Sequence, residues 1–341
     1  MISYELFYIA LMEIFLTLRD NLLSPPILFF ALGLLAGLIK SDLHFPDHVS
    51  RYLALYLMMA IGFKGGAALG AESVLSFTMV AALLGGVVIS FLMPFPVYAI
   101  IRRTTKLDAP TAAAVAAHYG SISMVTFVTA EAFLKNMGVP YESYIIAVLA
   151  LMEAPAIVAA LIIARTAQPA VKQHDGALRR ILTHDIFTNG AILMLLGALM
   201  IGALTGEKGM ARMEGFLVVP FGGVLCLFLL DMGLLVARQI HHLKAFTWPL
   251  ALVGLYVPLL GALVGLGFAR LIGMDVGTGM LLTVLCASAS YIAVPAAMRS
   301  AMPEAKAAIY LPLSLGITFP LNIAFGIPLY MALAQQFLGT P

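Results

Sequence analysis

The chain has 341 residues, of which 62% are hydrophobic even before its 30 glycines are counted, and only 11% are charged. A soluble domain carries about 25% charged residues and could not bury so much apolar surface. The composition therefore excludes a soluble enzyme, a disordered chain and a nucleic-acid-binding protein, and the net charge of +2 indicates no polyanionic partner. The sequence predicts an all-α polytopic protein of the lipid bilayer.

The first 23 residues are predicted to form an interfacial helix, because Tyr4–Leu18 is apolar but carries two acids. The alternative is that this stretch forms a first membrane span. A spanning helix needs about 20 apolar residues, and the remaining chain divides into ten segments of about that size. These segments cover residues 24–39, 46–69, 74–101, 108–135, 140–165, 184–205, 215–237, 246–271, 276–300 and 304–337.

The ten segments fall into two sets of five, separated by a polar linker. The linker covers residues 166–183, and the two sets cover residues 24–165 and 184–341. Both sets carry an Asp-x-x-Thr start, a glycine and a proline in the same order, half a chain apart. The matched residues are Asp108 and Asp275, Gly62 and Gly233, and Pro155 and Pro320. Because each set has an odd number of spans, the second must lie inverted relative to the first, which is typical of transporters.

The distribution of Lys and Arg predicts the orientation of the chain. Loops after odd-numbered segments, with their flanks, hold 13 basic residues, whereas the opposite side holds five, namely Arg19, Lys135, Lys208, Arg212 and Arg270. Cytoplasmic loops of membrane proteins are enriched in Lys and Arg. We therefore expect a cytoplasmic linker and two external termini.

Segments four and nine are interrupted near their middles by small and hydroxyl residues, which weaken a helix. These residues are Gly120, Ser121, Ile122 and Ser123 in segment four, and Ala287, Ser288, Ala289, Ser290 and Tyr291 in segment nine. If both helices break here, the free N–H groups and positive dipole ends of their second halves form a cradle for an anion. Loosened carbonyls and serine hydroxyls can also coordinate sodium. The alternative is close helix packing, for which membrane helices often use small residues.

Charged residues inside the spans are few, and each is a functional candidate because a charge in a bilayer is costly. Glu153 precedes a proline, which suits a cation ligand or a protonatable carboxylate, although it could also be a paired structural acid. Lys64 and Asp231 lie beside the matched glycines and either pair with each other or serve separate roles. Glu131 lies nearer the end of its segment.

Besides Lys64, three polar residues near the breaks and kinks are candidates for supporting the site. They are His118, Thr318 and Asn322. A lone histidine in apolar surroundings is more often structural than a proton relay, and an Asn beside a proline often caps freed backbone groups. No metal-ligand spacing, nucleotide-binding loop or nucleophile elbow is present. We therefore expect neither an enzyme nor an organic cofactor, and an ion gradient as the source of energy.

The chain resembles the cyanobacterial-type sodium-dependent bicarbonate transporters and their bacterial relatives over nearly its whole length. The motifs that carry the resemblance are Leu23–Pro26, Ile61–Gly66, Gly120–Ser123, Val139–Glu142, Glu153–Pro155 and Ala287–Ser290. The resemblance implies two inverted five-helix repeats, a core domain with crossed broken helices, a separate gate domain and a homotrimer in the bacterial inner membrane. It also implies sodium symport of bicarbonate by an elevator-like movement.

The chain departs from that family at several positions. It has Tyr291 and Glu153 where the family has Asp, Lys64 where the family has Ser, and an acid at Asp231 where the family has none. Its linker is also much shorter, which argues against the PII-like regulator of the family.

We expect the two breaks to bind bicarbonate or a related small anion, with Na⁺ as the coupling ion. The predicted sodium ligands are Ser123, Thr126, Glu153, Asp231 and Ser290. One alternative is a cation/proton antiporter that uses Glu153 and Asp231 as carriers. Another is a membrane sensor that binds a ligand without transporting it.

Overall fold

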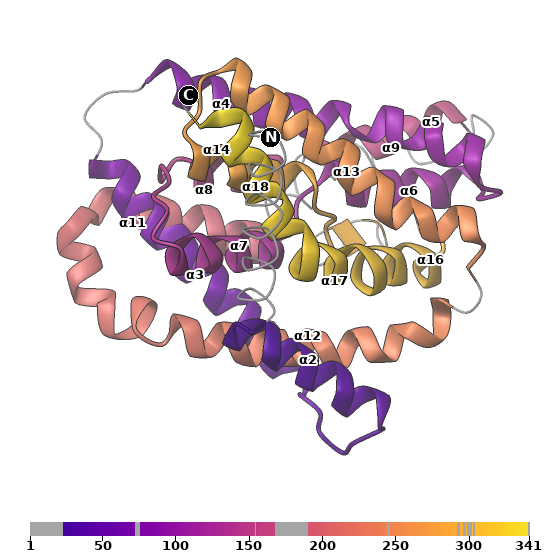
Figure 1. Ribbon diagram of the computed structural model, residues 1–341, viewed down its shortest axis with the longest axis horizontal. Helices are drawn as coiled ribbons and strands as arrows, with labels where there is room; N and C mark the ends of the chain where they lie inside the picture. The colour runs from indigo at the N-terminus through magenta and orange to yellow at the C-terminus, as the bar shows by residue number, and fades with distance from the viewer. Residues whose placement is uncertain are drawn as a thin grey trace, which may run out of the picture.

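The computed structural model describes residues 23–71, 76–153, 155–167, 190–243, 246–291, 294–295, 298, 302 and 304–339. All regular structure in these residues is helical (Figure 1). Seven of the described helices are long and apolar enough to cross a membrane. The predicted interfacial helix over Tyr4–Leu18 and the linker from residue 168 onward lie outside the described residues.

Helices follow the predicted segments along both halves of the chain. The first half holds α2 (Pro25–Leu38), α3 (Asp47–Ala71), α4 (Phe77–Leu92), α5 (Pro94–Thr104), α6 (Ala109–Gly120), α7 (Met124–Asn136), α8 (Ile145–Met152) and α9 (Pro155–Ala167). The second half holds α11 (Gly190–Met213), the π-helical turn η2 (Glu214–Val218), α12 (Phe221–Leu243), α13 (Trp248–Leu271) and α14 (Val276–Cys286).

The last segment is a run of short helical pieces rather than one regular helix. It comprises α16 (Ala307–Leu311), η3 (Pro312–Thr318), α17 (Phe319–Leu321), η4 (Asn322–Gly326) and α18 (Ile327–Leu338). Pro312, Pro320 and Pro328 recur every eight residues along it. Each proline removes a backbone donor and crowds the preceding turn, so the helix widens into π-helical turns between them.

Two helix pairs pack so closely that only glycine fits at their contacts. α2 crosses α12, and α3 lies against α11 (Figure 1). A Cβ atom at any of four glycines would overlap a carbonyl oxygen of the facing helix. These glycines are Gly33 and Gly233 in the first pair, and Gly66 and Gly202 in the second. Small residues let membrane helices approach each other, so these pairs are held by close backbone packing.

We predict that Gly66→Ala destabilises the protein by about 1–3 kcal/mol, because the new methyl group meets the Leu199 carbonyl in a contact that cannot yield. Gly197→Ala on α11 is the matched control, since a Cβ there meets nothing within 4 Å. It should be neutral or slightly stabilising through higher helix propensity. Thermal unfolding of the two purified variants checks this, and equal melting temperatures would contradict the tight packing.

The two helices that precede the predicted breaks begin with the same cap. Asp108 accepts a hydrogen bond from the N–H of Thr111 at 2.9 Å, and Asp275 accepts one from the N–H of Thr278 at 2.9 Å. Each side chain thereby satisfies a donor that the first turn of a helix leaves free. The shared Asp-x-x-Thr motif therefore marks equivalent helix starts.

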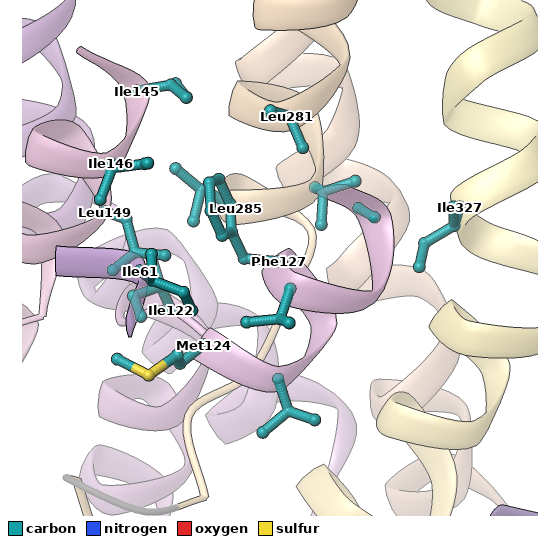
Figure 2. Close-up of a cluster of buried hydrophobic side chains, with 14 of the residues drawn as sticks. Ile61, Ile122, Met124, Phe127, Ile145, Ile146, Leu149, Leu281, Leu285 and Ile327 are labelled. Atoms are coloured by element: carbon teal, nitrogen blue, oxygen red, sulfur yellow. The ribbon is translucent and has the colours of Figure 1, made fainter. Parts of the chain in front are cut away.

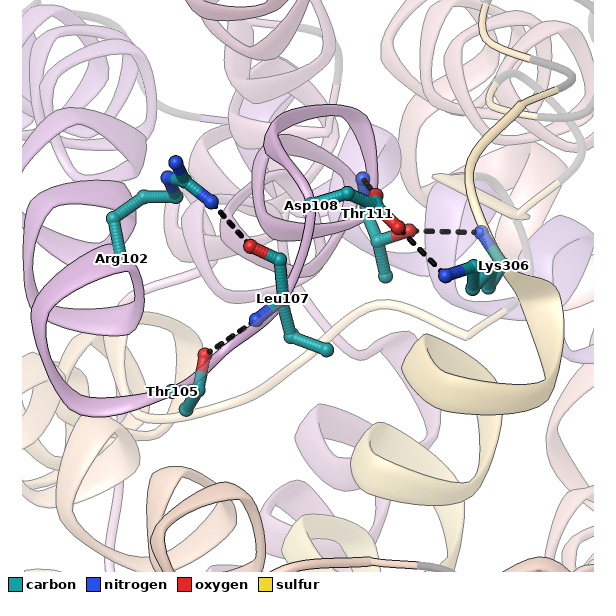
Figure 3. A network of polar contacts seen from close by, with 6 residues as sticks. All are labelled: Arg102, Thr105, Leu107, Asp108, Thr111 and Lys306. Carbon is teal, nitrogen blue, oxygen red and sulfur yellow. Dashed lines mark hydrogen bonds and ion pairs between the residues drawn. The ribbon is translucent and has the colours of Figure 1, made fainter.

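The threonines of the two caps also hold equivalent backbone groups from the other half of the chain. Thr111 Oγ1 accepts the N–H of Lys306 at 3.2 Å, and Thr278 Oγ1 accepts the N–H of Glu142 at 2.8 Å. Lys306 precedes α16, the first helix of the tenth segment, and Glu142 precedes α8, the first helix of the fifth. Lys306 also forms an ion pair with Asp108 at 2.8 Å (Figure 3). Each half of the chain thus fixes the start of a helix that belongs to the other.

The interior is centred on the broken helix of segment four. Every residue of α6 is buried, and burial continues without interruption to Glu131 of α7, whereas Lys135 and Asn136 at the end of α7 are exposed. Figure 2 shows the apolar cluster around its second half, where Phe127 of α7 meets Leu149 of α8 and Leu285 of α14. The breaks therefore lie inside the protein and away from lipid.

Candidate functional site

The first predicted break is confirmed at Ser121–Ser123. α6 ends at Gly120, the chain runs extended through three residues, and α7 begins at Met124. Ser123 caps α7, since its hydroxyl oxygen accepts the N–H of Thr126 at 3.2 Å and the Thr126 hydroxyl at 2.8 Å. Thr126 therefore orients Ser123, and the start of α7 lies deep inside the protein.

The second predicted break is confirmed at residues 287–291, which are not helical after α14 ends at Cys286. Ser290 is placed like Ser123, because its hydroxyl oxygen accepts the N–H of Val294 at 3.4 Å. Most of segment nine beyond this point lies outside the described residues, so the outcome for its second half stays a prediction.

The two breaks are joined to each other by backbone donors. The N–H of Ser123 donates to the hydroxyl of Ser288 at 2.8 Å, and the N–H of Ser290 donates to the carbonyl of His118 at 2.8 Å. Small residues let the two non-helical segments approach closely enough for these bonds. The first-turn N–H groups of Met124 and Val125 have no acceptor within α7, as in any helix.

A small cavity of about 10 Å³ lies between the breaks, which is about enough for one water molecule. It brings together residues from three predicted groups: the first break, the second break and the acid of segment five. The lining residues are Met58, Ile122, Ser123, Met124, Glu153, Ser290 and Tyr291. Met58 of α3 was not predicted, since nothing in its local sequence distinguishes it from other apolar helix residues.

Two polar atoms of residues that line this cavity lack hydrogen-bond partners. They are the carboxylate Oε2 of Glu153 and the hydroxyl of Tyr291, and within the part of the chain that the structure describes only one other buried side-chain atom, His118 Nε2, shares this state. An unsatisfied buried polar group costs about 1–3 kcal/mol, and more when it is charged. A void lined by carboxylate and hydroxyl oxygens suits a small hard cation.

α8 ends at Met152 and α9 begins at Pro155, and serine hydroxyls bond two carbonyls at this interruption. The carbonyl of Glu153 accepts the hydroxyl of Ser121 at 3.1 Å, and the carbonyl of Met152 accepts the hydroxyl of Ser90 at 2.6 Å. The Glu153 backbone is thus tied to the first break. This contact holds the carboxylate next to Ser123 and Ser290.

The three predicted supporting residues position the breaks and do not line the cavity. Asn322 donates to the carbonyl of Ala287 at 2.9 Å. Thr318 donates to the carbonyl of Gly254 at 2.9 Å and contacts the hydroxyl of Tyr119 at 2.7 Å. His118 bonds the carbonyl of Ala114 through Nδ1 at 2.6 Å, and its ring lies 4.6 Å from that of Tyr310. These contacts fix helix ends around the site.

Of the two alternatives for Lys64 and Asp231, the pairing with each other is wrong. Lys64 of α3 forms an ion pair with Glu131 of α7, and its ammonium also contacts the hydroxyl of Tyr141 at 3.2 Å. Asp231 interacts instead with Ser50 and Arg238, and it does not line the cavity between the breaks.

We predict that Lys64→Met destabilises the protein by about 2 kcal/mol, because Glu131 is left buried without its cation. The double variant Lys64→Met/Glu131→Gln should recover most of that loss. Lys64→Met/Asp231→Leu is the matched control and should recover none. Thermal unfolding measures the stability of all three variants. Recovery of stability in Lys64→Met/Asp231→Leu but not in Lys64→Met/Glu131→Gln would indicate that Lys64 pairs with Asp231 after all.

The fold and the site together define a class of protein. A helical membrane protein with two interlocked helix breaks around a buried polar cavity is typical of secondary transporters. The chain belongs to the Na⁺-dependent bicarbonate transporter superfamily, whose family model matches residues 25–335. This match confirms the family resemblance of the sequence. A comparison with curated proteins finds no match.

Proposed function

We propose that the protein is a symporter that couples the inward movement of bicarbonate, or of a related small anion, to Na⁺. The observation that carries this proposal is the unpartnered carboxylate oxygen of Glu153, aimed among hydroxyl groups between two helix breaks. The dependence on sodium that defines the family agrees with it.

In this proposal sodium binds in the cavity between the breaks. Glu153 supplies the negative charge, and the hydroxyls of Ser123, Ser290 and Tyr291 supply neutral oxygen ligands. Tyr291 thereby offers a neutral hydroxyl where the family has an Asp, and Glu153 keeps the acid at the second of these positions. Thr126 orients Ser123 through its hydroxyl, so it acts one step away from the ion. Asp231 has no part in this site.

The anion binds beside sodium, at the N–H groups that open α7. Met124 and Val125 offer two free donors, and the positive end of the helix dipole faces the same point. Bound sodium neutralises Glu153 and so removes the repulsion that this carboxylate would exert on an anion. That electrostatic dependence is the physical basis of coupling, because the anion binds well only after the cation.

The cavity of about 10 Å³ is too small for both ions, so the breaks must separate from the helix that covers them. Met58 of α3 forms that cover. An elevator-like movement of α6, α7 and α14 against α3 would open the site without disturbing the hydrogen bonds between the breaks. The small-residue contacts of α3 with α11 suit a rigid gate for this movement.

We further propose ten spans in two inverted repeats. The support comes from pairs of equivalent contacts between the two halves. The packing of α2 on α12 is equivalent to that of α3 on α11. The hydrogen bond of Thr111 with Lys306 is likewise equivalent to that of Thr278 with Glu142. The inner-membrane location and the trimer follow from the family resemblance. The short linker leaves little room for a PII-like regulator.

The test measures bicarbonate uptake into proteoliposomes over a range of sodium concentrations. We predict that Ser123→Ala and Glu153→Gln each raise the half-saturating sodium concentration at least about tenfold, the loss expected when one ligand worth about 1.4 kcal/mol is removed. Glu153→Asp should retain coupling. Ser314→Ala is the matched control, since this buried serine bonds only carbonyls of its own segment.

The same experiment separates the alternatives. Proton release without net anion uptake would indicate a cation/proton antiporter, and binding without flux would indicate a sensor. Unchanged sodium dependence in both variants would make these residues packing residues and contradict the proposed site.

The orientation has its own test. We predict that a cysteine at Gln173, in the linker, resists an impermeant thiol reagent in intact cells and reacts in inverted membrane vesicles. The excess of basic residues on the linker side is the reason. Wild-type protein gives the background from its own two cysteines. Rapid labelling in intact cells would reverse the topology.

A further inference from the structure

A second, much larger cavity of about 480 Å³ lies apart from the two breaks. Its walls come from the start of α2, one face of α3, the end of α7, η2 and the first turns of α12. It shares no lining residue with the cavity at the breaks. A volume of this size falls within the range of about 300–1,000 Å³ that is usual for organic ligands.

One wall of this cavity carries an ammonium group with donor capacity to spare. Lys64 has three N–H donors, and its contacts with Glu131 and Tyr141 use two of them. Tyr141 in turn donates to the same Glu131 oxygen, so this acid is already doubly bonded. The side chain of Lys64 remains 46% exposed, and it lines this cavity.

The charge of the lining is positive overall. Lys64 and Lys135 are cationic, Glu131 is the only acid in the lining, and the amide of Asn136 lies beside Lys135. Two positive charges and one negative charge leave an excess of one. A single anionic group would neutralise that excess and bind both ammonium groups through charge-assisted hydrogen bonds.

The rest of the lining is apolar. Pro26, Ala60, Ile61, Leu217 and Leu225 contribute aliphatic surface, and the thiol of Cys226 completes the wall. A bicarbonate-sized ion would occupy only a corner and leave this surface wet. A ligand with an apolar body and one carboxylate satisfies both parts of the lining, because burial of apolar area adds to the ionic contact.

We propose that this cavity binds amphipathic organic monocarboxylates, with the carboxylate at Lys64 and Lys135 and the apolar body against α3 and α12. The cavity lies between α7 and the helices that we propose to form the gate. One consequence rests on the proposed function: a bound carboxylate would contact α7 and the gate helices at once, restrain their relative movement and so inhibit transport. Binding and inhibition can be measured separately.

The binding test uses tritiated 2-naphthoate and the purified full chain in lipid nanodiscs. Gly222→Phe fills the cavity, and a Cβ at Gly222 meets nothing within 4 Å, so folding should tolerate the change. Gly223→Phe is the matched control, since its Cβ also meets open space but Gly223 does not line the cavity. We expect saturable binding to wild type and Gly223→Phe, and loss of at least tenfold in affinity in Gly222→Phe.

A second binding experiment tests whether the charges of the ligand and of the cavity matter. Lys135→Gln should weaken 2-naphthoate binding about tenfold, whereas Lys208→Gln, an exposed lysine of α11 outside the cavity, should not change it. The neutral alcohol 2-naphthalenemethanol and the small anion acetate should each compete poorly. Equal binding of acid and alcohol, or equal loss in both glycine variants, would overturn the proposal.

The transport arm distinguishes this site from the proposed function. We expect 2-naphthoate to inhibit bicarbonate uptake by wild type and Gly223→Phe. Gly222→Phe should still take up bicarbonate, and 2-naphthoate should inhibit this uptake little. Sodium-dependent uptake with no specific 2-naphthoate binding would overturn the carboxylate site and leave the transporter intact. Specific binding to a protein without uptake would support the site while contradicting the proposed function.

Discussion

A helix that stops inside a membrane releases backbone groups where no water can satisfy them, and this constraint organises the molecule. The protein meets it by placing two such breaks against each other. The N–H of Ser123 reaches Ser288, and the N–H of Ser290 reaches the carbonyl of His118. Buried backbone that is not helical survives only where protein groups satisfy it. Each break therefore uses the other to satisfy part of its backbone.

The same constraint explains why so many polar residues near the site do not bind a ligand. Asn322 satisfies the carbonyl of Ala287, Ser121 satisfies that of Glu153, and Ser90 satisfies that of Met152. Each of these bonds joins segments within one half of the chain, and the two bonds between the breaks join the halves to each other. A unit held by such bonds is suited to move as one body, which is what the proposed elevator-like mechanism requires.

The sequence predicted the features that depend on local chemistry. Small residues located both breaks, and Asp-x-x-Thr located two capped helices, because a cap and a helix break depend on a few adjacent residues. The family and the helical membrane fold were also predictable. The contact of Lys64 with Glu131 was not, since it joins residues of different helices that no local pattern links.

The wrong pairing of Lys64 with Asp231 has an instructive origin. It assumed that residues beside repeat-matched glycines meet each other. A repeat instead gives matched positions equivalent neighbours: a Cβ at Gly62 would press on Leu195 of α11, and one at Gly233 on Phe30 of α2. Matched residues therefore face matched partners on other helices, and their own contact is not implied.

The buried acids show how compensation separates structural charge from functional charge. Glu131 has Lys64 and Tyr141, and Asp231 has Ser50 and Arg238. Glu153 alone, among the buried acids of the described chain, has a fully buried carboxylate oxygen without a hydrogen-bond partner. A buried charge that is paired holds its helix in one position against its partner. A buried carboxylate that is unpaired attracts any cation or proton that can enter the site. The hydroxyls around Glu153 can coordinate a cation but supply no charge of their own. In the proposed mechanism an ion from outside completes the site, and this need for an external ion is how an ion gradient would do work on the protein.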